Sequence, residues 1–185
     1  HWGMPLLESA ITLIEADRLY YRGHDVLQLA ASCPVEQVAA LIWAGSLTAD
    51  VPGLTRPREP ALSPRLAGLW EQVQDLPPVE QFDILLPLAA TEDLAGYDLR
   101  PAAVAQTGAK ILHLLASVAA GPSEADNIAR KLQQGWRPDR PAAAGLINAA
   151  LMLCADHEVN VSWFTARCVA SAGASPYQVV GPARG

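Results

Sequence analysis

Charged residues are scarce in this 185-residue sequence, and basic residues are not in excess. Charged residues make up 17% of the chain against 51% hydrophobic residues, and the formal net charge is −6. A composition this rich in apolar side chains is typical of a packed core and excludes a disordered chain. Nucleic acids and anionic membrane surfaces are bound by clusters of Lys and Arg, which are missing here, so we expect neither as a partner.

Cysteines are few, and long apolar runs are absent. The three cysteines, Cys33, Cys154 and Cys168, are odd in number, widely spaced and set among apolar neighbours. Their spacing matches no metal site, so we expect no metal and interpret them as reduced core residues of a cytoplasmic protein. We find no signal peptide, no repeat, and no apolar run of the roughly 18 residues that a membrane helix needs.

The apolar residues recur mostly at helical spacing, between Ser, Asp, Pro and Gly residues that begin or end helices. Two β-rich runs at 11–14 and 19–21 predict a short hairpin, and the Pro-rich stretch 46–60 predicts a loop. The fold class is therefore all-α and multi-helical, with a small N-terminal β-hairpin. We divide the chain into an N-terminal segment and hairpin (1–25), a helical domain (26–180) and a C-terminal remnant (181–185). Helices are predicted over 26–31, 34–44, 63–74, 79–90, 101–120, 123–134, 141–154 and 160–172.

The polar stretch 155–162, which reads ADHEVNVS, interrupts two apolar segments that we expect to form largely buried helices. Burying so many polar groups is costly unless they are paired or used. Asn160 or Ser162 is a good N-cap for the second helix. His157 would then precede the positive end of a helix dipole, which together with burial lowers the pKa of its ring. A neutral histidine at this place can donate a hydrogen bond to a carbonyl oxygen.

Three segments carry a resemblance to one family. Residues 156–167 read DHEVNVSWFTAR and resemble the DHE-x-N-x-S-T-F-x-A-R segment of the citrate synthase family. Residues 19–25, LYYRGHD, are similar to that family's L-x-YRGYD, and residues 35–45, VEQVAALIWAG, to its FEEVAxLLxxG. The segments stand in the family's order, and the resemblance runs from about residue 11 to residue 177, which is the first half or so of the family's chain.

The resemblance implies the helical large domain of a citrate synthase, paired as a homodimer through the helices at 101–120 and 160–172. It implies condensation of acetyl-CoA, or a close acyl-CoA, with oxaloacetate or a related 2-oxo acid to give citrate and CoA. Acetyl-CoA is then a substrate, and no cofactor is tightly bound. His157 matches the catalytic histidine, which donates a hydrogen bond to the thioester oxygen during enolisation. An aspartate and a second histidine of the family have no match here, and we assign no substrate-binding residue.

Two departures keep a second hypothesis open. The predicted helix 123–134 lacks the family's oxaloacetate-binding histidine, and GPARG at 181–185 stands where the family continues with GP-x-HGG. The alternative to an enzyme is a truncated, non-catalytic dimerisation or regulatory protein of the same family. A generic Ala-rich helical scaffold is the weakest interpretation. We expect the complete protein to be an acyltransferase and these 185 residues alone to be inactive.

Four other residues receive structural interpretations. Arg22 and His24 belong to the YRG-like segment and should tie the hairpin to the helices. His113 lies on an apolar helix face and should be a hydrogen-bonded core histidine. Arg167 lies inside a helix and should pair with a carboxylate or with a partner subunit.

Overall fold

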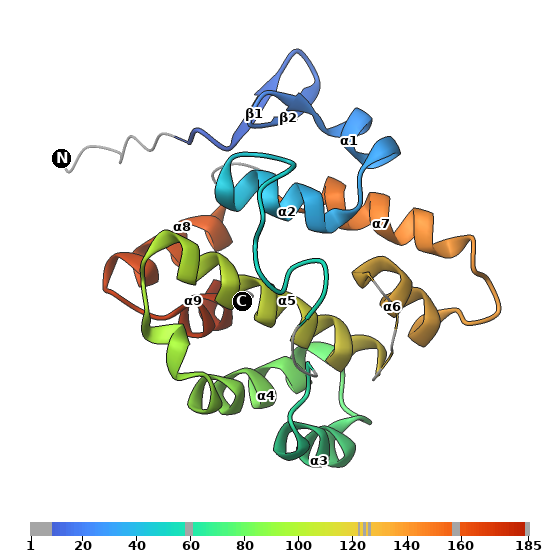
Figure 1. Ribbon diagram of the computed structural model, residues 1–185, viewed down its shortest axis with the longest axis vertical. Helices are drawn as coiled ribbons and strands as arrows, with labels where there is room; N and C mark the ends of the chain where they lie inside the picture. The colour runs from blue at the N-terminus through green and yellow to red at the C-terminus, as the bar shows by residue number, and fades with distance from the viewer. Residues whose placement is uncertain are drawn as a thin grey trace.

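A computed structural model of the chain describes residues 9–57, 61–121, 123, 125, 127–156 and 160–183. Helices surround one long central helix, and a small sheet lies at one end (Figure 1). The all-α fold class with an N-terminal hairpin is therefore confirmed. The strands are β1 (Thr12–Glu15), β2 (Arg18–Tyr21) and β3 (His24–Asp25). The helices are α1 (Val26–Ser32), α2 (Val35–Ala44), α3 (Pro64–Val73), α4 (Pro78–Glu92), the 3₁₀ helix η1 (Leu94–Tyr97), α5 (Pro101–Ala120), α6 (Ile128–Trp136), α7 (Ala143–Leu153), α8 (Val161–Ser171) and α9 (Pro176–Ala183).

The N-terminal sheet is antiparallel, with strand order β1-β2-β3. Ala16 and Asp17 turn the chain between β1 and β2, both with positive φ, as the two-residue turns of hairpins require. This pairing places Thr12 directly opposite Tyr21. The two-residue β3 was not predicted; it pairs with β2 after the turn at Arg22 and Gly23, whose φ values are 45° and 85°.

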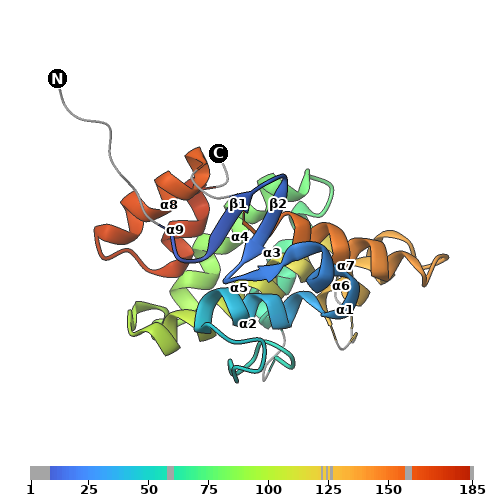
Figure 2. The same ribbon diagram turned by 90° about the horizontal axis from the view of Figure 1, so that it is seen from above.

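Helix α5 forms the centre of the molecule and packs against α2, α4, α6 and α9. Among the described residues it is the one helix long and apolar enough to cross a membrane, but half of the residues in that window are buried inside the fold. Such burial is typical of a core helix. Figure 2 shows α8 and α9 on one side of this central region, and α6 and α7 on the other.

The α5–α6 contact is unusually close because a glycine lies in it. A Cβ atom on Gly135 would overlap the backbone oxygen of Ala120 and would lie 2.6 Å from the Cα of that residue. The neighbouring Trp136 donates a hydrogen bond from Nε1 to the oxygen of Ala119, over 2.8 Å. Gly135, which directly follows the predicted helix 123–134 and lies inside α6, thus allows two backbones to touch.

Helix α6 begins later than the sequence pattern predicted. The predicted helix starts at Ser123, but the cap is Asn127, whose Oδ1 accepts a hydrogen bond from the Arg130 N–H over 2.8 Å. Ser123 caps a local turn instead, by accepting from the Ala125 N–H. At the other end of the chain, α9 runs across residue 180, where we had divided the helical domain from a C-terminal remnant.

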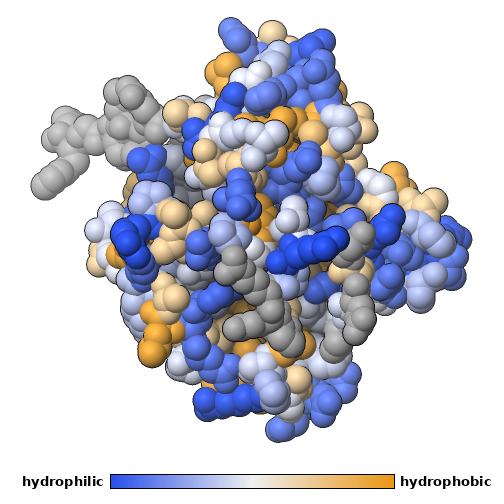
Figure 3. Space-filling view, viewed as in Figure 1, coloured by the Kyte–Doolittle hydropathy of each residue, from blue (hydrophilic) through white to orange (hydrophobic). Residues whose placement is uncertain are grey.

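The two helices that flank the polar stretch are far more exposed than expected. In α7 only Met152 is buried, and in the described α8 no residue is. Cys154 and Cys168, predicted as core residues, are exposed; both are free, as is the half-buried Cys33. These predictions were wrong because apolar composition indicates that a face is suited to burial but does not say what covers it. Figure 3 shows hydrophobic residues in several separate patches between hydrophilic ones on the viewed face.

Candidate functional site

The polar stretch joins the end of α7 to the start of α8. His157, the predicted catalytic residue, and its neighbours 158 and 159 lie outside the described residues. The role of His157 therefore stays a prediction. The structure does describe the two residues that bound this segment, Asp156 and Asn160, and both are held by specific hydrogen bonds.

Asp156 is held by a pair of residues from the N-terminal hairpin. The Tyr21 hydroxyl lies 2.9 Å from the oxygen of Met152 and 3.0 Å from the oxygen of Asp156, and it accepts a hydrogen bond from the Asp156 N–H over 3.2 Å. The Thr12 hydroxyl donates to the Asp156 carboxylate. The YRG-like segment and the DHE-like segment, far apart in the sequence, therefore meet in space.

Asn160 begins the second helix, as one of the two predicted caps. Its backbone is extended, and its Oδ1 accepts a hydrogen bond from the Trp163 N–H over 2.8 Å. The first N–H groups and the positive end of the α8 dipole consequently lie at this junction. The junction can favour an anionic group or a neutral histidine, and it disfavours an imidazolium ion.

The middle of α7 is also tied to the α1–α2 junction, through Asn148. Its Oδ1 accepts from the Val35 N–H and its Nδ2 donates to the oxygen of Cys33, each over 2.9 Å. Arg22 donates from Nε and Nη2 to the oxygen of Ile42, so its predicted structural role is confirmed. Sequence reasoning missed Asn148 because one asparagine in an apolar helix has no distinguishing pattern.

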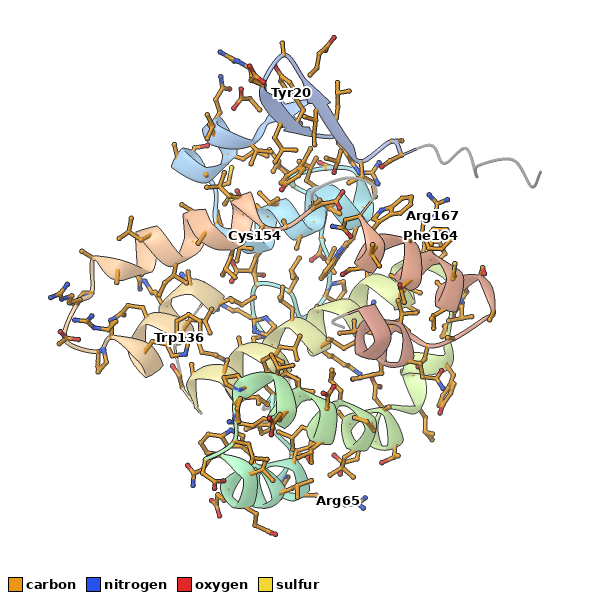
Figure 4. The ribbon with its side chains drawn as sticks, turned by 180° about the vertical axis from the view of Figure 1, so that it is seen from behind. Tyr20, Arg65, Trp136, Cys154, Phe164 and Arg167 are labelled. Carbon is orange, nitrogen blue, oxygen red and sulfur yellow. The ribbon has the colours of Figure 1, made fainter. Side chains whose placement is uncertain are left out.

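Arg167 makes a cation–π contact within its own helix, and its predicted pairing with a carboxylate or a partner subunit stays a prediction. Its guanidinium lies over the ring of Trp163, 4.4 Å from the ring centroid, in a cation–π contact within α8. Figure 4 shows Phe164 and Arg167 on the same outer side of this helix. Phe164 is 44% exposed and Val161 is 80% exposed, so α8 presents an exposed apolar face.

His113 is a core histidine, as predicted, and it lies apart from the α7–α8 junction. It is buried on α5, and its Nε2 lies 2.7 Å from the oxygen of Leu54. Burial, aided by the charge of Lys131, lowers the pKa of its ring, while the carbonyl of Leu54 and the charge of Glu36 act in the opposite direction. Its Nδ1 has no hydrogen-bond partner among the described residues. A ring in this setting is neutral near pH 7.

A cavity of about 530 Å³ adjoins His113 and is lined by polar groups from α4, α5 and α9. Asp93 accepts hydrogen bonds from Lys110 Nζ over 2.8 Å and from the Tyr177 hydroxyl over 3.1 Å. Burial and the charge of Asp93 raise the pKa of Tyr177, so its phenol keeps its proton. These groups satisfy one another and tie α9 to the α4–α5 connection. No sequence motif joins them, and sequence reasoning did not find them.

Metal ligation has no support in the described part of the chain. No three His, Cys, Asp or Glu residues of that part come together in a group that could hold an ion.

Comparison with known proteins points to one family. The family model described as "Citrate synthase, C-terminal domain" matches residues 1–184. A citrate synthase of Mycolicibacterium smegmatis is 30% identical over 92% of this chain and 50% of its own length. The 2-methylcitrate synthase 2 of Corynebacterium glutamicum is 26% identical over 90% of this chain and 50% of its own. The chain thus spans about half the length of these curated relatives.

Solved structures show the same likeness in fold. The citrate synthase of Pyrobaculum aerophilum superposes with a TM-score of 0.83, at 21% identity, over 97% of this chain and 52% of its own. The citrate synthase of the thermophilic archaeon Thermoplasma acidophilum, solved as a ternary complex with carboxymethyl coenzyme A and oxaloacetate, gives a TM-score of 0.78 at 15% identity. The match covers 97% of this chain and 52% of the chain of that structure.

Proposed function

This chain belongs to the citrate synthase family, and we propose on that basis that the complete protein condenses an acyl-CoA with a 2-oxo acid. Acetyl-CoA and oxaloacetate, giving citrate and CoA, are the substrates that we put first. Propionyl-CoA is the second acyl donor to test, because one similar protein is a 2-methylcitrate synthase and another a citrate synthase. No tightly bound cofactor is needed for this reaction.

The observation that carries the proposal is the junction of α7 and α8. The family's DHE-like segment lies there, and Asp156 is fixed by Tyr21 and Thr12 while Asn160 caps α8. In this proposal His157 is neutral and donates a hydrogen bond to the thioester oxygen of the bound acyl-CoA. The bond strengthens as negative charge develops on that oxygen during enolisation, so it lowers the barrier more than it tightens binding.

We further propose a homodimer, with the exposed face of α8 at its interface. Val161 and Phe164 are the large apolar side chains of this face, and Arg167 lies beside them. The C-terminal part of α5, the other helix that we expected at the interface, is buried within the subunit, whereas its first turn is exposed. Three free cysteines support a reducing compartment, and we propose the cytoplasm.

The first test is a CoA-release assay on the protein at its natural length, after its intact mass has been compared with the 19.6 kDa of these residues. Release should require both the acyl-CoA and the 2-oxo acid. His157→Ala should lower kcat by about 10²- to 10³-fold, the effect of losing one oxyanion donor. His24→Ala, which alters an exposed histidine of the hairpin, should leave kcat unchanged.

Two outcomes would overturn the proposal. No CoA release with any pairing of acetyl-CoA or propionyl-CoA with oxaloacetate or pyruvate would favour the non-catalytic dimerisation or regulatory protein. Near-normal turnover by His157→Ala would remove His157 from the mechanism. A thermal melt of His157→Ala accompanies the assay, because a collapsed melt would assign the residue to folding.

A further inference from the structure

We propose that Tyr21 is a positioning residue for His157, acting through the backbone of Asp156. The role extends the proposed function, because it assumes that the direction of His157 determines turnover. The observations that carry it concern Asp156 and the hairpin, and they stand apart from the identity of the substrates.

The Tyr21 hydroxyl belongs to a buried side chain and connects two distant parts of the chain. Its residue is 0% exposed, and the hydroxyl lies within hydrogen-bond distance of three backbone groups. Two are the carbonyl oxygens of Met152 and Asp156, at 2.9 and 3.0 Å, and the third is the Asp156 N–H, at 3.2 Å. One hydroxyl proton serves the two carbonyls, and an oxygen lone pair accepts from the N–H. The phenol thus spans the last turn of α7 and the residue directly before His157.

The same rung of the hairpin also holds the Asp156 side chain. Thr12 lies opposite Tyr21 across the β1–β2 pair, and its hydroxyl donates to the Asp156 carboxylate. The backbone and the side chain of Asp156 are therefore both held by one cross-strand pair. The held Asp156 carbonyl belongs to the peptide bond that joins this residue to the next, so the contact acts on the backbone that leads into His157.

Packing alone does not account for these contacts. The Tyr21 ring belongs to an apolar cluster with Val26, Val38, Leu41 and Met152, and a phenylalanine would fill that space equally well. Only the hydroxyl reaches Asp156. Burial raises the pKa of this phenol, so the hydroxyl keeps the proton that it donates.

The test compares Tyr21→Phe with Tyr20→Phe in the protein at its natural length. Tyr20 is the adjacent residue of β2 and points to the other face of the strand, as the alternation of strands requires (Figure 4). Three quantities are measured for each variant: the kcat and KM values of CoA release, the thermal midpoint, and the imidazole ¹⁵N signals of histidine-labelled protein. The His157 signal is identified by its loss in His157→Ala.

We expect Tyr21→Phe to lower kcat by about 10- to 100-fold, the size of effect that a misplacement of roughly 1 Å produces, with KM changed far less. The His157 imidazole signals should shift, whereas Tyr20→Phe should match the wild type in all three measurements. If Tyr21→Phe does not fold, Thr12→Val supplies the test, with a smaller fall in kcat and a shift of the same signals.

Unchanged kcat together with unchanged His157 signals in folded Tyr21→Phe would overturn the proposal. The imidazole measurement also separates this inference from the proposed function. A wild-type protein that releases no CoA, but whose His157 signals shift in Tyr21→Phe, contradicts the synthase activity and upholds the positioning contact. If the wild type releases CoA and Tyr21→Phe has the same kcat and the same His157 signals, the positioning role of Tyr21 is contradicted and the synthase activity is not.

Discussion

The two apolar helices α5 and α8 have similar kinds of sequence and opposite surroundings. Both carry apolar residues along much of their length and were expected to be buried or to lie at an interface. Helix α5 runs through the core and packs against α2, α4, α6 and α9 among others, whereas no described residue of α8 is buried and α8 packs mainly against α9. An apolar face therefore predicts burial against some surface but does not identify that surface.

The difference extends to the contacts that each region makes. On the α5 side, glycine lets the backbones of α5 and α6 touch, and Trp136 closes the contact with a hydrogen bond. On the α8 side, Phe164 and Val161 remain 44% and 80% exposed. Substitutions on the α5 side should therefore change the free energy of unfolding, and those on α8 should change association.

The largest loss of stability is expected from Gly135→Ala. The added Cβ would overlap the oxygen of Ala120, a backbone atom that cannot move without shifting α5 or α6. Overpacking typically costs about 1–3 kcal/mol, and a backbone clash belongs at the upper end of that range. Urea unfolding followed by circular dichroism measures the change.

Gly145→Ala is the matched control for this substitution. Gly145 lies inside α7, and no atom outside its own helix turn lies within 4 Å of the place that an added Cβ would take. Replacing an interior helical glycine with alanine should stabilise the protein by about 0.5–1 kcal/mol. Equal effects of both substitutions, in sign and size, would contradict the close α5–α6 contact.

A loss of intermediate size is expected from Asn148→Ala. The variant leaves the Val35 N–H and the Cys33 oxygen without their partner at the α1–α2 junction. Unsatisfied groups of this kind cost about 1–3 kcal/mol in unfolding free energy. Asn148→Asp keeps an acceptor for Val35 and should lose less, while the exposed Gln72→Ala should stay within about 0.5 kcal/mol of the wild type. The same loss in Gln72→Ala as in Asn148→Ala would contradict this role.

Much of the fold could be predicted from the sequence because its helix signals are local. Gly45 ends α2 in the left-handed conformation, Asn160 caps α8, and the hairpin lies where the β-rich runs placed it. The start of α6 was placed too early because both Ser123 and Asn127 are good caps. Local patterns alone could not decide between them.

The site was predictable only in part. The three family-like segments located the α7–α8 junction, and family membership is confirmed. The hydrogen bonds from Tyr21 to Asp156 could not be predicted, because they join residues 135 positions apart and depend on the packing of the hairpin against α7. Asp93, Lys110 and Tyr177 also meet only in the fold, and no local pattern marks them.

A smaller effect, visible only in its dependence on pH, is expected from His113. Its folded pKa lies below the value of about 6.5 in the unfolded chain, mainly because it is buried. Above that value both states are neutral at this residue. As pH falls below it, the unfolded chain takes up the proton first, so stability falls with pH until the folded pKa is reached. The charges of Lys131 and Glu36 act on the pKa of the ring in opposite directions.

The measurement is the unfolding free energy between about pH 5.5 and 7.5 for wild type, His113→Gln and His24→Gln. The slope of unfolding free energy against pH is compared between wild type and His113→Gln. The difference between the two slopes reports on His113, because the carboxylates are the same in all three proteins. His24→Gln, a substitution at an exposed histidine, is the control. An unchanged slope in His113→Gln would contradict a buried neutral ring.

The smallest effect on monomer stability is expected on α8, where the comparison with α5 is most direct. Phe164→Ser removes an apolar side chain that is already 44% exposed, so the free energy of unfolding per monomer should change by no more than about 0.5 kcal/mol.

If α8 forms the proposed dimer interface, however, an aromatic residue at its centre should dominate association, with a loss of about 2 kcal/mol or more in binding free energy. Leu94→Ser is the control, because it removes an apolar side chain that is 79% exposed and lies on η1, not on α8. Sedimentation at micromolar concentration should show dimers for wild type and Leu94→Ser and a shift to monomers for Phe164→Ser. A monomeric wild type would contradict the homodimer itself, and dimers of Phe164→Ser as stable as those of the wild type would place the interface elsewhere.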